Sequence, residues 1–158
     1  MSNEIRKSIS MKAPQSRVWQ ALTDHKQFGE WFRVNLQSPF EAGKEARGNI
    51  TYPGYEHVMF EANVVKIQPE SYFAFTWHPY AVDPKVDYST EKPTLVEFNL
   101  SHKDGVTHLE VVESGFENIP EGRRPEAFRM NTGGWEEQVF NFVILARALK
   151  PGPIGDFR

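Results

Sequence analysis

The stretch MNTGGWEEQVFNFVILARAL, Met130–Leu149, decides how the rest of the chain can fold. Its apolar residues recur every three or four positions and form one stripe of a helix, made of Trp135, Val139, Phe142, Ala146 and Leu149. Pro151 and Gly152 follow, and they end the helix. A helix with one apolar stripe must cover something, so the segment predicts a long C-terminal helix packed on an apolar surface.

Two glycines, Gly133 and Gly134, stand ahead of Trp135, although glycine is a poor helix former. In one interpretation they let the start of the helix approach a sheet or loop closely, so that Trp135 is the first large group over a cavity. In the other, they mark a kink and Trp135 belongs to an ordinary core. Pockets and cores use the same apolar residues, so the sequence leaves both interpretations open.

Five segments upstream alternate between apolar and polar residues, as strands of a half-buried sheet do. They are ARGNITY (46–52), HVMFEANVVKI (57–67), SYFAFTW (71–77), TLVEFNL (94–100) and THLEVVES (107–114). The connections between them are rich in turn-forming residues and favour an antiparallel meander over parallel βαβ units. One face of the predicted sheet is strongly aromatic.

The N-terminal part predicts one more strand and two short helices. Ile5–Met11 alternates as a strand does, and residues 13–24 carry an apolar face at helical spacing. Asp24 can cap a second short helix, which we expect Gly29 to end. Asn35–Lys44 is expected to be irregular. The predicted order is therefore a strand, two short helices, five strands and a long helix.

Composition narrows the class of protein. The 158 residues fit one domain, 1–158, and 39% hydrophobic with 25% charged residues is typical of a soluble globular protein. The net charge of -3 gives no electrostatic footprint for nucleic acid. The chain has no cysteine, no signal-peptide pattern and no apolar run of about 18 residues that could span a membrane. We therefore expect a cytoplasmic protein with no membrane or nucleic-acid partner.

The order of elements, with several short motifs, resembles the START-like (SRPBCC) superfamily. The motifs are SRVWQALTD, PFEAGKEARG, IQPESYFAFTW, VVESGF and GGW, in that order along the chain. Within the superfamily, the sequence is most similar to bacterial proteins that resemble the C-terminal domain of the heat-shock-protein-90 ATPase activator (AHSA-like). The resemblance runs from about Ile5 to Leu149.

This resemblance implies an α+β helix-grip fold, as in birch pollen allergen. A curved antiparallel sheet, here expected to have six strands, wraps a long C-terminal helix and leaves a cavity between them. Superfamily members bind lipids, sterols, polyketides or plant hormones, and a few are cyclases or hydrolases. The loop Tyr80–Pro93 is longer than the connection of a minimal β-hairpin, which suggests that the chain belongs to a specialised branch of the superfamily.

Nine residues are the candidate ligand contacts: Trp31, Phe60, Phe75, Trp77, His78, Phe98, Glu113, Trp135 and Phe142. The family geometry implies that Trp31 lies at the mouth of the cavity, while His78 is the candidate for a polar group at its rim. Glu113 continues an inward-facing alternation, so it is either a buried carboxylate with partners or the point at which the strand reaches solvent.

Catalytic and metal-binding patterns are not found. None of the five histidines stands in an HxH or HExxH arrangement, and ESGF lacks the G-x-S-x-G elbow of hydrolases. We therefore expect no metal, no cofactor and no catalytic residues, and we predict a non-enzymatic protein that binds a small apolar or amphipathic molecule. The alternatives are a chaperone-associated accessory protein and an enzyme acting on a hydrophobic cyclic substrate. Both a monomer and a homodimer fit the sequence.

Overall fold

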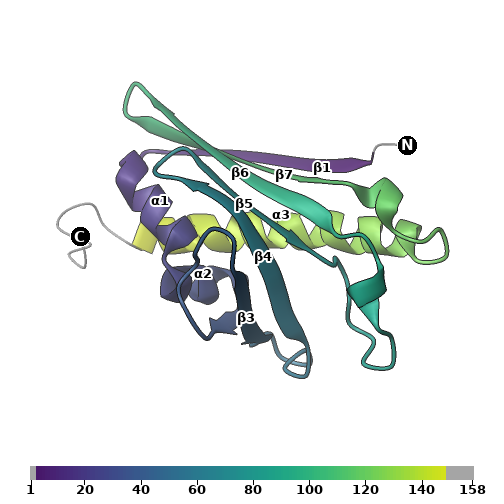
Figure 1. The fold of residues 1–158 in the computed structure, drawn as a ribbon. Coiled ribbons are helices and arrows are strands. Elements are labelled where there is room, and N and C mark those ends of the chain that lie inside the picture. Colours follow the sequence, from purple (N-terminus) through teal and green to yellow (C-terminus); the bar gives the residue numbers. More distant parts are fainter. Residues whose placement is uncertain (1–2, 149–158) are drawn as a thin grey trace.

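The computed structural model describes residues 3–148, and it has the predicted α+β architecture (Figure 1). Seven antiparallel strands form one sheet in the order β1-β7-β6-β5-β4-β3-β2. The long helix α3 (Arg124–Ala148) lies along one face of this sheet, and α1 (Gln15–Thr23) and α2 (His25–Phe32) pack near its C-terminal half. Helix and sheet thus enclose the core between them, as the helix-grip fold requires.

The strands have the following bounds: β1 Glu4–Met11, β2 Val34–Leu36, β3 Glu45–Ile50, β4 Met59–Gln68, β5 Tyr72–Trp77, β6 Thr94–Lys103 and β7 Val106–Ser114. Two single 3-10 turns, η1 (Tyr88–Thr90) and η2 (Phe116–Asn118), lie in the connections. The predicted inward faces are confirmed: the residues that alternate toward the helix are buried, among them Phe60, Phe75, Phe98 and Val111. None of the helices within residues 3–148 is long and apolar enough to cross a membrane.

The sheet has seven strands rather than six because of β2, which lies where irregular chain was expected. β2 has only three residues, too few to show an alternating pattern. It pairs with β3 through Val34↔Ile50 and Leu36↔Gly48. A Cβ at Gly48 would lie 2.2 Å from the carbonyl oxygen of Asn35, so this pairing needs a glycine at that position.

The predicted cap of α2 is confirmed, but its predicted end is wrong. Asp24 accepts a hydrogen bond from the backbone N–H of Gln27 at 3.1 Å. The helix continues past Gly29 to Phe32 and ends at Arg33, which has a left-handed φ of 69°. Gly29 instead makes room for the returning chain, since a Cβ there would lie 2.3 Å from the carbonyl oxygen of Val34.

Helix α3 begins at Arg124, six residues before the segment from which it was predicted, and runs unbroken through Gly133 and Gly134. A Cβ at either glycine would meet no atom within 4 Å. Of the two interpretations left open by the sequence, the one in which these glycines bring the helix close to a sheet or loop is therefore wrong. Trp135 and Phe142 are buried under the helix as predicted, whereas Leu149 lies outside the described residues.

Candidate ligand-binding site

The space between the sheet and α3 has a packed part and an open part. In the packed part, Phe142 meets Trp31 edge to face, with ring centroids 5.2 Å apart, and Trp135 meets Phe98 at 5.9 Å. A void of only about 10 Å³ remains among these rings. That space is barely enough for one water molecule, so this part of the interface is core.

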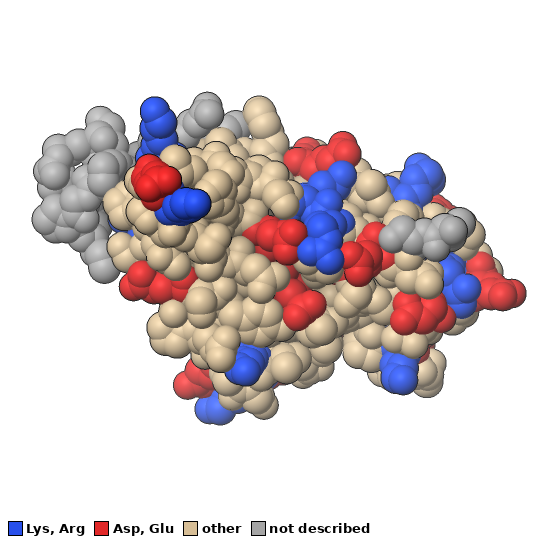
Figure 2. Space-filling view, turned by 90° about the horizontal axis from the view of Figure 1, so that it is seen from above, with Lys and Arg blue, Asp and Glu red and all other residues tan. Residues whose placement is uncertain are grey.

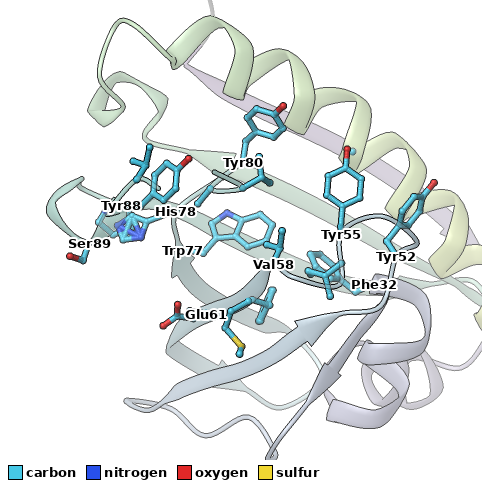
Figure 3. Close-up of a pocket in the computed structure, with 18 of the residues that line it drawn as sticks. Phe32, Tyr52, Tyr55, Val58, Glu61, Trp77, His78, Tyr80, Tyr88 and Ser89 are labelled. Carbon is cyan, nitrogen blue, oxygen red and sulfur yellow. The ribbon is translucent and has the colours of Figure 1, made fainter. Parts of the chain in front are cut away.

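The open part is a cavity of about 850 Å³ (Figure 3). Its volume lies in the range of roughly 300–1,000 Å³ that is usual for small-molecule sites. It lies between the strand ends of β3, β4 and β5, the turn 52–58, the loop 78–93 and the middle of α3. The aromatic lining residues are Phe32, Tyr52, Tyr55, Phe60, Trp77, His78, Tyr80 and Tyr88.

Two local features keep this part of the interface open. The pairing between β4 and β5 begins only at Asn63↔Thr76, so the first four residues of β4, Met59–Ala62, pair with β3 alone. After Trp77 the chain leaves the sheet into the long loop. On the helix side, Gly134 borders the cavity and has no side chain to fill it.

One wall of the cavity is a cluster of three rings. Phe60 lies 5.4 Å from Phe32 and 5.8 Å from Trp77, measured between ring centroids, and Phe32 lies 5.8 Å from Trp77. Edge-to-face and tilted contacts of this kind are the preferred geometries of aromatic pairs. Packing among the rings therefore holds them in place and leaves a preformed apolar surface on the cavity side.

Glu113 fixes the orientation of Trp77. The Trp77 indole N–H donates to Glu113 Oε2 at 2.7 Å, and the hydroxyl of Thr94 donates to the same oxygen at 2.6 Å. The indole N–H of Trp135 and the amide of Asn131 donate to Oε1 at 2.8 and 2.9 Å. Glu113 is fully buried, so the inward interpretation is confirmed and the solvent interpretation is wrong. These four donors satisfy the buried carboxylate.

Arg123, just before α3, anchors the loop 78–93. Its guanidinium makes a two-pronged ion pair with Glu91, and both side chains are mostly buried. It also donates to the carbonyl oxygens of Pro79 at 2.9 Å and Tyr80 at 3.3 Å, and it lies 4.7 Å from the centroid of the Tyr88 ring. One arginine thus ties both ends of the loop to the base of the helix.

His78 lies on the cavity rim, where it was expected. Its Nε2 lies 2.9 Å from the carbonyl oxygen of Glu91, so the ring contacts the opposite end of the same loop. Burial lowers the pKa of His78 below its usual value near 6.5, and this effect outweighs the opposing attraction of Glu91. The imidazole is therefore neutral at pH 7.

Of the nine candidate contacts, Phe60, Trp77 and His78 line the cavity. Five others lie in the packed interior: Trp31, Phe75, Phe98, Trp135 and Phe142. The expectation that Trp31 lies at the cavity mouth is wrong, because its ring is buried and its indole N–H donates to the carbonyl oxygen of Ala21 at 2.9 Å. Short helix α2 carries Trp31 into the core and leaves Phe32 at the cavity.

Sequence reasoning missed the tyrosines. Four of the five in the chain, Tyr52, Tyr55, Tyr80 and Tyr88, surround the cavity in Figure 3. Tyr55, Tyr80 and Tyr88 lie in turns and loops, where no periodic pattern assigns a direction to a side chain, and Tyr52 lies beyond the end of β3, although the predicted strand 46–52 included it. Their clustering near the strand ends was the one available signal. Within residues 3–148, no three histidine or acidic side chains gather so that they could hold a metal ion.

The fold and the cavity together define a helix-grip protein of the START-like class. The family model described as "Activator of Hsp90 ATPase homolog 1-like protein" matches residues 12–146. The chain belongs to this family. Among curated proteins, none matches the sequence significantly.

Solved structures share the fold at low sequence identity. MLL2253 from Mesorhizobium loti is 20% identical with a TM-score of 0.70, over 90% of this chain and 95% of that one. The Aha1 dimer from Colwellia psychrerythraea is 18% identical with a TM-score of 0.65, over 95% and 98%. DynU16, a protein of the dynemicin biosynthetic locus, is 24% identical with a TM-score of 0.70. That match covers 96% of this chain, which spans about half of DynU16 (49%).

Proposed function

We propose that the protein binds a small hydrophobic or amphipathic molecule, without catalysis, in the cavity between the sheet and α3. The observation that carries this proposal is the cavity of about 850 Å³, which is open while the neighbouring part of the same interface is packed. A protein that needed only stability would gain from filling this space, because cavities lower the free energy of unfolding.

In this proposal, Trp77 is the main apolar contact and Phe60 and Phe32 support it from behind. Glu113 presents the indole in one orientation, so little side-chain freedom is lost when a ligand binds. His78 supplies a neutral polar group at the rim. The tyrosines offer rings with hydroxyl groups, which suits a ligand that has both apolar and polar parts.

Tryptophan emission tests the proposal, because Trp77 lines the cavity and Trp135 lies behind it. Amphipathic aromatic compounds and long-chain lipids should change the emission saturably. Trp77→Ala should weaken binding by about 2 kcal/mol, a loss of roughly 30-fold, while the protein stays folded. Trp19→Phe is the matched control, since Trp19 packs on the core from α1.

Trp135→Ala separates the two parts of the interface. It removes a buried indole and should mainly lower the free energy of unfolding, by several kcal/mol. If no compound in a chemically broad panel saturates the emission change, and Trp77→Ala is as destabilising as Trp135→Ala, the binding proposal is wrong.

A chaperone-associated role is the second candidate, favoured by the family to which the chain belongs. It predicts that the protein raises the ATP turnover of an Hsp90-type chaperone from the same cell. An unchanged rate over a wide concentration range would contradict it. Surface substitutions far from the cavity, rather than Trp77→Ala, should then abolish the effect.

A further inference from the structure

The charge of the cavity lining is one-sided. Four carboxylates line it, those of Glu45, Glu61, Asp87 and Glu137. Among the described residues that line the cavity there is no lysine or arginine, and the one histidine is neutral at pH 7. The surface seen from above in Figure 2 is different, since acidic and basic side chains are interspersed over that face.

Four guanidinium groups, those of Arg33, Arg47, Arg123 and Arg129, act on groups around the cavity, but none of them lines it. Arg123 is paired with Glu91. Arg47 is shared between Glu45 and Glu61, at 3.5 Å from each, and so leaves an excess of one negative charge. Arg33 lies 5.9 Å from the centroid of the Tyr52 ring.

On the helix side, Glu137 forms no ion pair among the described residues and accepts a hydrogen bond from the Tyr52 hydroxyl at 3.1 Å. This bond raises the pKa of Tyr52 above its usual value, even though Arg33 acts in the opposite direction. Burial and the carboxylate of Glu126 likewise raise the pKa of Tyr80, against the smaller opposite effect of Arg129. At each hydroxyl the effect of a carboxylate is therefore larger than the opposing effect of an arginine.

We infer that the cavity takes an amphipathic ligand with a positive charge, a protonated amine or a quaternary ammonium joined to an apolar body. This inference rests on the proposed function. Faces of tyrosine and tryptophan rings attract cations, and the attraction grows when the cation is partly removed from water. Tyr55, Tyr80 and Trp77 point toward the shared space in Figure 3, and the carboxylates complement the charge. An anionic ligand would meet no lining lysine or arginine.

Three probes of the same shape test the charge preference: a phenylalkyl-trimethylammonium ion, the neutral analogue with carbon in place of nitrogen, and a phenylalkyl sulfonate. Each is titrated against the tryptophan emission of the full chain. We expect the cation to bind about tenfold more tightly than the neutral analogue, and the sulfonate not to saturate.

Glu137→Gln should reduce the preference for the cation about threefold, by removing one charge from the wall. Glu136→Gln is its matched control: it changes the net charge equally, but Glu136 pairs with Lys7 at 2.9 Å and does not line the cavity. It should leave the preference unchanged.

The outcomes separate this inference from the proposed function. If the neutral probe or the sulfonate binds as tightly as the cation, the charge inference is overturned while the binding function stands. An equal loss of preference in Glu136→Gln and Glu137→Gln also overturns it, because a general charge effect would then explain the preference. If none of the three probes saturates, both the inference and the proposed function lose their support.

Discussion

The packed and open parts of the sheet–helix interface both contain clusters of aromatic rings, yet only one of them leaves usable space. Around Phe142, rings from α2, β6 and α3 fill the interface to within about 10 Å³. About two helical turns toward the N-terminus of α3, at Gly134, the helix contributes no side chain, and β4 is no longer paired with β5. A cluster of aromatic rings therefore does not by itself decide between pocket and core; the missing side chain at Gly134 and the end of the β4–β5 pairing do.

The largest expected effect is on the packed part. Phe142→Ala should lower the free energy of unfolding by about 3 to 5 kcal/mol, because its ring is 1% exposed and the cavity left behind cannot collapse easily. Urea unfolding followed by circular dichroism measures this. Phe140→Ala, on the exposed side of the same helix, is the control, and its effect should be small. A loss near 1 kcal/mol for Phe142→Ala would mean that the ring borders open space instead.

The next largest effect is expected at Glu113, which accepts hydrogen bonds from Trp77 in the open part and from Trp135 in the packed part of the interface. Glu113→Gln keeps the shape of the side chain but replaces one carboxylate oxygen by an NH2 group. Each carboxylate oxygen accepts two of the four hydrogen bonds, so the NH2 group would face two donors and accept from neither. We expect a loss of about 2 to 3 kcal/mol and a changed Trp77 emission, since buried polar groups lose their partners. Glu110→Gln, on the exposed side of β7, is the control. Unchanged emission would show that Glu113 does not position Trp77.

A smaller effect, of opposite sign, is expected at the two glycines of α3, Gly133 and Gly134. Gly133→Ala and Gly134→Ala should each stabilise the protein by about 0.5 to 1 kcal/mol, because a Cβ at either position meets no neighbouring atom and alanine favours the helix. Thermal unfolding measures this gain.

Larger side chains at the two glycines should differ in function. Gly134→Leu should weaken ligand binding because residue 134 lines the cavity, and Gly133→Leu should not. Equal binding by both leucine variants would show that the helix side of the cavity is not a contact surface.

The smallest effect concerns pH. Burial lowers the pKa of His78 in the folded protein, so below about pH 6.5 the unfolded chain binds more protons and the folded state loses stability as the pH falls. His78→Gln should remove this part of the dependence and flatten the stability profile between pH 7 and pH 5. His102→Gln, which changes an exposed histidine of β6, is the control. Equal slopes for His78→Gln and the unaltered protein would contradict the assignment.

Much of the fold could be predicted from local sequence because it rests on periodic burial. Phe60, Phe75 and Phe98 alternate along strands, and the alternation places them on one face whatever their partners are. Trp135 and Phe142 follow helical spacing for the same reason. Strand β2 could not be predicted, since its three residues are too few to alternate and are held by pairing with β3, where Gly48 lets the backbone of Asn35 approach closely.

The candidate site was predictable only in part, for a related physical reason. The sequence by itself determined which rings of the strands and of the long helix face inward, and that Glu113 lies in line with them. Only the tertiary structure decided that Trp31 is core and Phe32 is wall, that four donors meet at Glu113, and that loop tyrosines surround the cavity. Periodicity fixes the direction of a side chain within an element, whereas empty space depends on how several elements meet, and no single segment carries that information.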